Sequence, residues 1–166
     1  MSTIKNIEEA FSGESQANRR YHAFAIQADK DGFPQIAKLF RAAAEAETIH
    51  ALAHLKAMDG IQSTEENLKV AAEGERYEFQ EMYPQFLTTA QQEGQKRAEI
   101  NFKQAGAAEE VHYNLYKLAL QAVQAGQDLE SLSIYVCPVC GNIEIGTRSE
   151  RCPICNAPAD KYFEVK

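Results

Sequence analysis

Most of the chain, residues 4–126, shows the mixture of apolar and polar positions that is typical of long helices. Alanine and leucine recur among glutamate, glutamine and lysine, and Pro34 and Pro84 are the only prolines there. The pattern predicts four helices, at about residues 4–30, 32–59, 64–92 and 93–125.

Turn and capping residues mark the ends of these predicted helices. In chain order they are Asp31-Gly32, Asp59-Gly60, the capping-box pattern Ser63-x-x-Glu66, and Gly126. Pro84 lies inside the third helix, where it removes a backbone hydrogen bond, so we expect a kink there.

Residues 135–166 have a different composition from the helical part. They hold all four cysteines and three of the five prolines, with little helical periodicity. Residues 127–134 form a short linker before them. We therefore predict two domains, at residues 1–132 and 133–166.

An internal repeat relates the first two helices to the last two. At an offset of 62 residues Phe40 matches Phe102, Glu47 matches Glu109 and His50 matches His112, and at an offset of 61 Gly13-Glu14 matches Gly74-Glu75. A duplicated helix hairpin builds a bundle with approximate two-fold symmetry, and a two-metal site fits on such an axis.

Acidic and histidine residues on these helices form a candidate metal-binding set. Its members are Glu14, Glu47, His50, Glu75, Glu78, Glu109 and His112. Positions three apart share a helix face, so each Glu-x-x-His motif places a carboxylate beside an imidazole. A single such motif is typical of a solvated surface, but two copies at matching repeat positions argue against that interpretation. One glutamate from each of two helices plus Glu-x-x-His from the other two is the pattern of di-iron carboxylate bundles.

That pattern needs six ligands, and Glu78 is a seventh. A spare carboxylate allows exchange with a histidine as the metal changes charge. The more oxidised iron prefers an anionic oxygen ligand, whereas ferrous iron accepts imidazole readily.

Several motifs together resemble the rubrerythrin family over essentially the whole chain. They are Gly13-Glu14-Ser15-Gln16-Ala17, the two Glu-x-x-His motifs, and Gly74-Glu75-x-Tyr77-Glu78-x-x-x-Met82-Tyr83-Pro84. The resemblance implies an all-α ferritin-like four-helix bundle followed by a small C-terminal rubredoxin-like metal-knuckle domain. It also implies that one iron moves between His50 and Glu78 on redox change.

The same resemblance places two tyrosines, Tyr21 and Tyr83, beside the di-iron site. Their hydroxyl groups could hydrogen-bond the ligand carboxylates or donate protons. The alternative is that both are ordinary core tyrosines.

The four cysteines form two Cys-x-x-Cys pairs, Cys137 with Cys140 and Cys152 with Cys155, separated by eleven residues. Clustered cysteines favour a metal site over a disulfide framework, and two such pairs provide a tetrahedral four-sulfur site. Zinc and iron both suit that geometry. Similarity to rubredoxin, and fusion to a predicted redox bundle that needs a one-electron carrier, favour iron.

The overall balance of residues is that of a globular protein. Apolar residues make up 45% and charged residues 25%, and the net charge of −7 without a basic patch argues against nucleic acid as a partner. We see no signal peptide and no membrane-spanning segment, so the expected location is the cytoplasm.

The short break between the second and third helices bears on the oligomeric state. Residues 59–63 reach at most about 18 Å, whereas the second helix is about 42 Å long. The chain therefore forms either a plain up-down-up-down bundle or a homodimer that exchanges helix pairs. We predict the domain-swapped homodimer.

The leading functional hypothesis is a non-haem iron peroxidase that reduces hydrogen peroxide, in which the four-cysteine iron returns electrons one at a time. The resemblance implies peroxide as the substrate, and a rubredoxin or an NAD(P)H-dependent reductase as the electron donor. The alternative is a ferritin-like protein that oxidises and stores iron, which the electron relay argues against. A zinc-ribbon interaction module on an inert bundle leaves the seven converging ligands unexplained.

Overall fold

The computed structural model describes residues 2–166. The chain divides between Gln62 and Ser63 into two compact units. The predicted helices are confirmed, with ends that differ from the predicted ones by no more than three residues.

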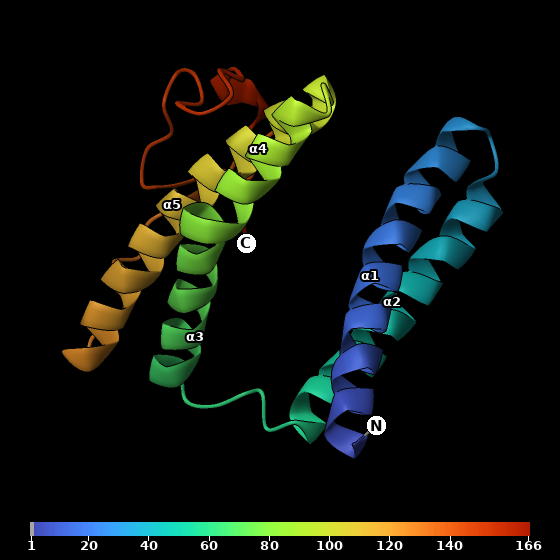
Figure 1. The fold of residues 1–166 in the computed structure, drawn as a ribbon, viewed down its shortest axis with the longest axis horizontal. Helices are drawn as coiled ribbons and strands as arrows, with labels where there is room; N and C mark the ends of the chain where they lie inside the picture. The colour runs from blue at the N-terminus through green and yellow to red at the C-terminus, as the bar shows by residue number, and fades with distance from the viewer. Residues whose placement is uncertain (1) are drawn as a thin grey trace. The chain divides into compact units, whose positions relative to one another are not determined.

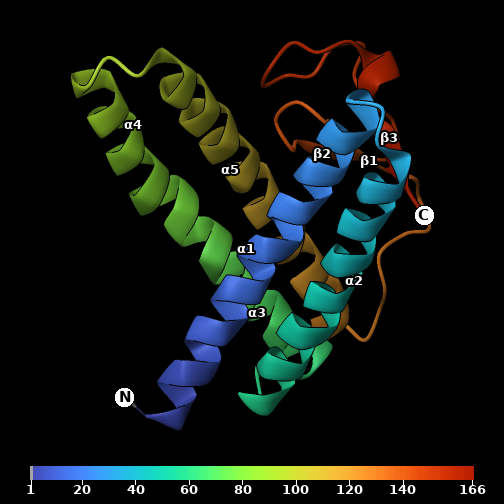
Figure 2. The same ribbon diagram turned by 90° about the vertical axis from the view of Figure 1, so that its right-hand side faces the viewer.

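The first unit is a hairpin of α1 (Thr3–Lys30) and α2 (Pro34–Ala57), which lie side by side in both views (Figures 1 and 2). Gly32 adopts a left-handed conformation with φ of 82° in the turn between them. The buried apolar residues of the hairpin are all alanines, namely Ala25, Ala28, Ala37, Ala44 and Ala51. Small side chains allow the two helices to approach closely.

Larger apolar side chains of the hairpin are exposed within this chain. Leu39 and Ile49 are each 68% exposed, and Phe24, Ile26 and Leu52 are also exposed. Two helices whose buried apolar side chains are all alanines have too small an apolar core to be stable alone. The hairpin therefore needs a further surface to cover these side chains.

The helical part of the second unit consists of α3 (Thr64–Tyr77), a π-helical turn η1 (Glu78–Met82), α4 (Tyr83–Gln92) and α5 (Lys96–Gln124). The predicted capping box opens α3: the Ser63 hydroxyl accepts from the Glu66 N–H, and the Glu66 carboxylate accepts from the Ser63 N–H. The last helix of the unit, α5, ends as predicted just before Gly126, which has a left-handed φ of 71°.

The predicted third helix is interrupted shortly before Pro84. The Tyr83 N–H donates to the Glu78 carbonyl, which is five residues back, as in a π-helix. The axis changes direction between α3 and α4 (Figure 1). The sequence predicted an interruption at this proline but not its π-helical form.

The C-terminal segment forms a three-stranded antiparallel sheet of β1 (Ile134–Val136), β2 (Ile143–Ile145) and β3 (Phe163–Val165), with β1 in the centre. Tyr135 pairs with Glu144 on one side and with Glu164 on the other. A short 3₁₀ turn, η2 (Ala159–Lys161), precedes β3. The core of this segment consists of Cys137, Cys152, Ala157 and Tyr162.

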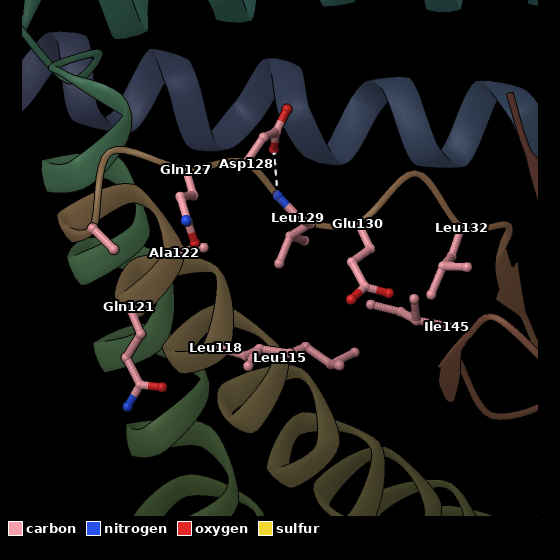
Figure 3. Close-up of a pocket in the computed structure, with 11 residues that line it drawn as sticks. Leu115, Leu118, Gln121, Ala122, Gln127, Asp128, Leu129, Glu130, Leu132 and Ile145 are labelled. Carbon is pink, nitrogen blue, oxygen red and sulfur yellow. Dashed lines mark hydrogen bonds between the residues drawn. The ribbon is translucent and has the colours of Figure 1, made fainter.

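An apolar pocket of about 470 Å³ lies between α5, the linker and Ile145 (Figure 3). Leu115, Leu118, Leu129 and Leu132 line it, and the Leu129 N–H donates to the Asp128 carboxylate at 2.7 Å. None of the predicted metal ligands lines this pocket.

Within residues 2–166, no helix is both long enough and apolar enough to cross a bilayer.

Candidate metal centres

The first hairpin brings three predicted ligands together. Glu14 lies on α1, and Glu47 and His50 lie one turn apart on α2. The His50 Nδ1 atom is 3.1 Å from a Glu47 carboxylate oxygen and 3.9 Å from a Glu14 carboxylate oxygen. The His50 side chain is 56% exposed within this chain, so one side of the cluster is open.

The second unit repeats this arrangement with Glu75 on α3 and with Glu109 and His112 on α5. The His112 Nδ1 atom is 2.7 Å from a Glu109 oxygen and 3.8 Å from a Glu75 oxygen. In each triad the ligand atoms all lie within 4.8 Å of one another. Two carboxylates and one imidazole at such distances are a donor set that suits iron.

The repeat extends to aromatic residues in each half of the chain. The ring centroids of Tyr21, Phe24 and Phe40 are separated by 6.3, 6.2 and 5.5 Å, and those of Tyr83, Phe86 and Phe102 by 6.3, 6.2 and 5.6 Å. The two halves of the chain therefore share one local architecture, as the sequence repeat predicted.

The π-helical turn adds one residue to the second half. Tyr21 follows Glu14 by seven positions, whereas Tyr83 follows Glu75 by eight, which is why the repeat offset changes from 61 to 62. Glu78 is the first residue of this turn. The surplus carboxylate, Glu78, thus lies where the second half of the repeat is one residue longer than the first. The change of the repeat offset from 61 to 62 already marked this place in the sequence.

Glu78 lies beside the second triad without being part of it. It is not among the three residues whose ligand atoms lie within 4.8 Å of one another. Burial raises its pKa, and the charge of Glu109 raises it further. Glu78 is therefore close enough to interact electrostatically with Glu109 and His112.

In each triad the pKa of one carboxylate is raised by the carboxylate beside it. Burial raises the pKa of Glu75 to about 7, and the hydrogen bond and negative charge of Glu109 add to the increase. In the first triad, the hydrogen bond with Glu47 raises the pKa of Glu14. Two carboxylates held this close share a proton unless a cation replaces it.

Tyrosine hydroxyl groups lie near the second triad. Burial and the charge of Glu109 raise the pKa of Tyr83, and burial and the charge of Glu75 do the same for Tyr116. The family resemblance pointed to Tyr83 but not to Tyr116. Tyr116 lies four residues after His112, on the same helix face.

The ring of His112 is held by a hydrogen bond to the C-terminal segment that carries the cysteines. Its Nε2 atom is 2.9 Å from the Gly141 carbonyl oxygen. A carbonyl only accepts, so Nε2 carries a proton, and Nδ1, which faces Glu75 and Glu109, is the nitrogen that can coordinate a metal once it has lost its own proton. No sequence signal predicted this contact, which spans 29 residues.

The four cysteines converge as predicted. Cys137 Sγ lies 3.5 Å from Cys155 Sγ, and Cys140 Sγ lies 3.5 Å from Cys152 Sγ, with all four thiols free. The two Cys-x-x-Cys loops have equivalent hydrogen bonds. The Gly141 N–H donates to the Cys137 carbonyl in the first loop, and the Asn156 N–H donates to the Cys152 carbonyl in the second. This arrangement suits a tetrahedral iron or zinc ion.

Comparison with known proteins decides the family. The rubrerythrin family model matches residues 5–120, and the model for the rubredoxin-like domain of rubrerythrin matches residues 135–163. The chain belongs to the rubrerythrin family.

Individual relatives are similar over nearly their whole length. Nigerythrin from Nitratidesulfovibrio vulgaris is 38% identical, over 97% of this chain and 85% of its own. Rubrerythrin from the same organism is 36% identical, over 98% and 93%, and rubrerythrin-2 from Clostridium acetobutylicum is 34% identical, over 96% and 95%. A solved structure of mixed-valence nigerythrin matches with a TM-score of 0.59 and 36% identity, over 99% of this chain and 87% of that one.

Membership confirms the predicted fold class, a ferritin-like helical domain with a C-terminal rubredoxin-like knuckle domain. This rubrerythrin-family chain carries candidate ligands for a di-iron carboxylate centre in its two triads and for a four-cysteine iron centre in its C-terminal segment.

Proposed function

We propose that this rubrerythrin-family protein reduces hydrogen peroxide to water at a di-iron site. The observation that carries the proposal is the pair of matched Glu-Glu-His triads with one extra carboxylate, Glu78, beside the second. When bound, the two ferrous ions supply one electron each, so that peroxide and two protons become two molecules of water.

The ligands in this proposal are the seven predicted residues. They are Glu14, Glu47, His50, Glu75, Glu78, Glu109 and His112. Each triad supplies only three, so a complete site needs one hairpin α1–α2 together with one set of α3–α5. Such a union also covers the large apolar side chains that the hairpin leaves exposed.

We propose that this union forms between two chains in a domain-swapped homodimer. Six residues separate the end of α2 at Ala57 from the start of α3 at Thr64, and they reach at most about 22 Å. The 24 residues of α2 extend about 36 Å. The link therefore cannot follow the length of a bundle, as a ferritin-like connection within one chain requires.

The two histidines suit different roles. The Gly141 carbonyl accepts from His112, whereas the contacts of His50 within its own unit are with the carboxylates of Glu14 and Glu47. This difference supports His50 as the ligand that exchanges with Glu78, while His112 stays in place.

The same hydrogen bond supports the four-cysteine centre as an electron relay. Gly141 directly follows Cys140, so a short covalent path and one hydrogen bond of 2.9 Å connect a thiol ligand to the His112 ring. We propose a rubredoxin or an NAD(P)H-dependent reductase as the external donor. The free thiols favour a reducing compartment, and we propose the cytoplasm.

Tyr21 and Tyr83 are the proposed proton donors. Each packs in an equivalent aromatic cluster, Tyr21 against Phe40 and Tyr83 against Phe102. The raised pKa of Tyr83 keeps its hydroxyl protonated, so it can hydrogen-bond a carboxylate or a bound oxygen species. The proposed domain boundaries remain residues 1–132 and 133–166.

A pair of matched variants tests the role of Glu78 in peroxide reduction. In stopped-flow mixing of the reduced, iron-loaded protein with peroxide, Glu78→Ala should slow oxidation by about 10- to 100-fold while six ligands retain the iron. Glu81→Ala is the control, because Glu81 lies on the same π-helical turn but is exposed and pairs with Arg76 at 3.4 Å. Equal oxidation rates in both variants would contradict the proposal.

A further inference from the structure

The C-terminal segment, residues 133–166, has a core made largely of its candidate metal ligands. Cys137 and Cys152 are two of its four buried core residues, and Cys140 and Cys155 pack against them. Each of its three strands is three residues long. Segments of fewer than about 40 residues usually need a metal or another cross-link to fold. Because the four thiols are free, a metal that binds them stabilises the folded form of the whole segment.

The first Cys-x-x-Cys loop is closed by two backbone hydrogen bonds. The Cys137 N–H donates to the Asn142 carbonyl at 2.9 Å, and the Gly141 N–H donates to the Cys137 carbonyl at 2.9 Å. Gly141 has a left-handed φ of 81°, which glycine adopts without strain, and Asn142 is only 1% exposed. The folded loop therefore fixes the direction in which the Gly141 carbonyl points.

That carbonyl is the acceptor for the second triad's histidine. It lies 2.9 Å from His112 Nε2, and Nδ1 of the same ring lies 2.7 Å from a Glu109 oxygen and 3.8 Å from a Glu75 oxygen. A hydrogen bond at one ring nitrogen orients the other toward the metal, so the ring needs no ordering when the metal binds. The loop that wraps one metal site thus orients a ligand of the other.

We propose that the four-cysteine centre has a second function, in which a metal bound there folds the loop that carries Gly141 and so raises the metal affinity of the second triad. Gly141 is a positioning residue, because it acts on the triad through His112. Loss of such a partner costs a ligand histidine about 10- to 100-fold in metal affinity. Coupling of this kind is reciprocal, so a metal in the triad strengthens binding at the cysteines by the same factor.

The first triad provides an internal comparison. His50 is the repeat counterpart of His112, but its contacts in the hairpin are with Glu47 and Glu14, and its unit contains no cysteine. The coupling should therefore depend on His112 and not on His50. The inference rests on the two proposed metal centres, but it does not require that the protein reduce peroxide.

The test uses the full chain, prepared without metal and with its thiols reduced. One equivalent of zinc per chain fills the four-cysteine site, because thiolates select zinc, and the loss of reactive thiols confirms it. Manganese(II), which suits carboxylates, then probes the triads, and electron paramagnetic resonance measures the manganese that stays free. Zinc should lower the dissociation constant of the manganese bound by His112 about 10- to 100-fold. Equal manganese binding with and without zinc would overturn the proposal, and zinc has no redox chemistry, so neither result depends on peroxide reduction.

Matched histidine variants show whether the effect passes through His112. In His112→Asn, manganese binding should be weaker, and zinc should no longer change it. In His50→Asn, the other half of the repeat loses its ligand, but zinc should still raise the affinity of the remaining site about tenfold or more. If zinc raised the affinity equally in both variants, it would act by general stabilisation of the protein, which would refute the proposal.

Nuclear magnetic resonance of the nitrogen-15-labelled imidazole rings reads the hydrogen bond itself. After zinc fills the four-cysteine site, and before manganese is added, the His112 Nε2–H should give a signal that exchanges slowly with water. His112→Asn identifies this signal by its loss. The same signal in the zinc-free protein would show that the hydrogen bond forms without a metal at the cysteines, and would contradict the coupling.

Discussion

Glu75 is the residue whose protonation most directly reports on metal binding. Its pKa of about 7 comes mainly from burial and then from Glu109. The hydrogen bond with Glu109 also raises the pKa of His112. Both groups must lose their protons to become ligands, so binding competes with protonation below neutral pH.

We therefore predict that ferrous ion binding to the triad weakens as the pH falls through about 7, and that it releases more protons at pH 6 than at pH 8. Anaerobic titration calorimetry in buffers of different ionisation enthalpy measures this release, with the four-cysteine site already filled. Glu75→Gln should remove the share of the difference that comes from Glu75 and leave that of His112, whereas Glu73→Gln, at a side chain that is 65% exposed, should keep all of it. Proton release that does not depend on pH in the wild type would contradict the assignment of Glu75.

At the scale of elements, the π-helical turn explains how two copies of one hairpin became different. It shifts Tyr83 and Phe86 by one residue relative to Glu75, so the aromatic cluster still meets Phe102 on α5. It also places Glu78 beside the second triad. A regular α-helix in its place would rotate α4 by about 100° relative to α3.

Deletion of Gln80, an exposed residue within this turn, tests that explanation. The deletion should restore a regular helix, turn Tyr83 and Phe86 away from Phe102, and lower the melting temperature by roughly 5 °C or more. Gln80→Ala retains the length of the turn and should change the melting temperature little. Calorimetry on both variants decides, and an unchanged melting temperature after the deletion would show that the turn does not set the register.

Particular residues show what could be predicted from the sequence. The helices, the capping box at Ser63 and the two Glu-x-x-His motifs follow local spacing rules, and the structure confirms them. The bond between His112 and Gly141 and the bond between Asn142 and Tyr162 depend on tertiary contacts between distant residues, which periodicity does not encode. In the sequence, the only sign of the π-helical turn was the change of the repeat offset by one residue.

In the proposed dimer, the two triads that form one di-iron site come from different chains. A hairpin with only alanines in its core and a short link after Ala57 both favour exchange between two copies. Exchange of identical elements is a recognised route to homodimers.

Complementation between two inactive variants tests this arrangement. One variant carries Glu14→Ala and Glu47→Ala, and the other carries Glu75→Ala and Glu109→Ala. If the helix pairs are exchanged, a mixed dimer contains one intact site, so co-refolded chains should regain about a quarter of the wild-type di-iron sites. Each variant refolded alone is the control. If the mixture regained no sites, each bundle would have to form within a single chain.

The central claim is peroxide reduction with the four-cysteine centre as relay, and stopped-flow absorbance tests it most directly. The fully reduced, iron-loaded protein is mixed with hydrogen peroxide without oxygen, and the visible colour of the four-cysteine centre is followed. We predict rapid return of that colour, with about one peroxide consumed per two electrons. Slow oxidation by peroxide, together with faster consumption of added ferrous iron and oxygen, would contradict it and indicate iron oxidation or storage.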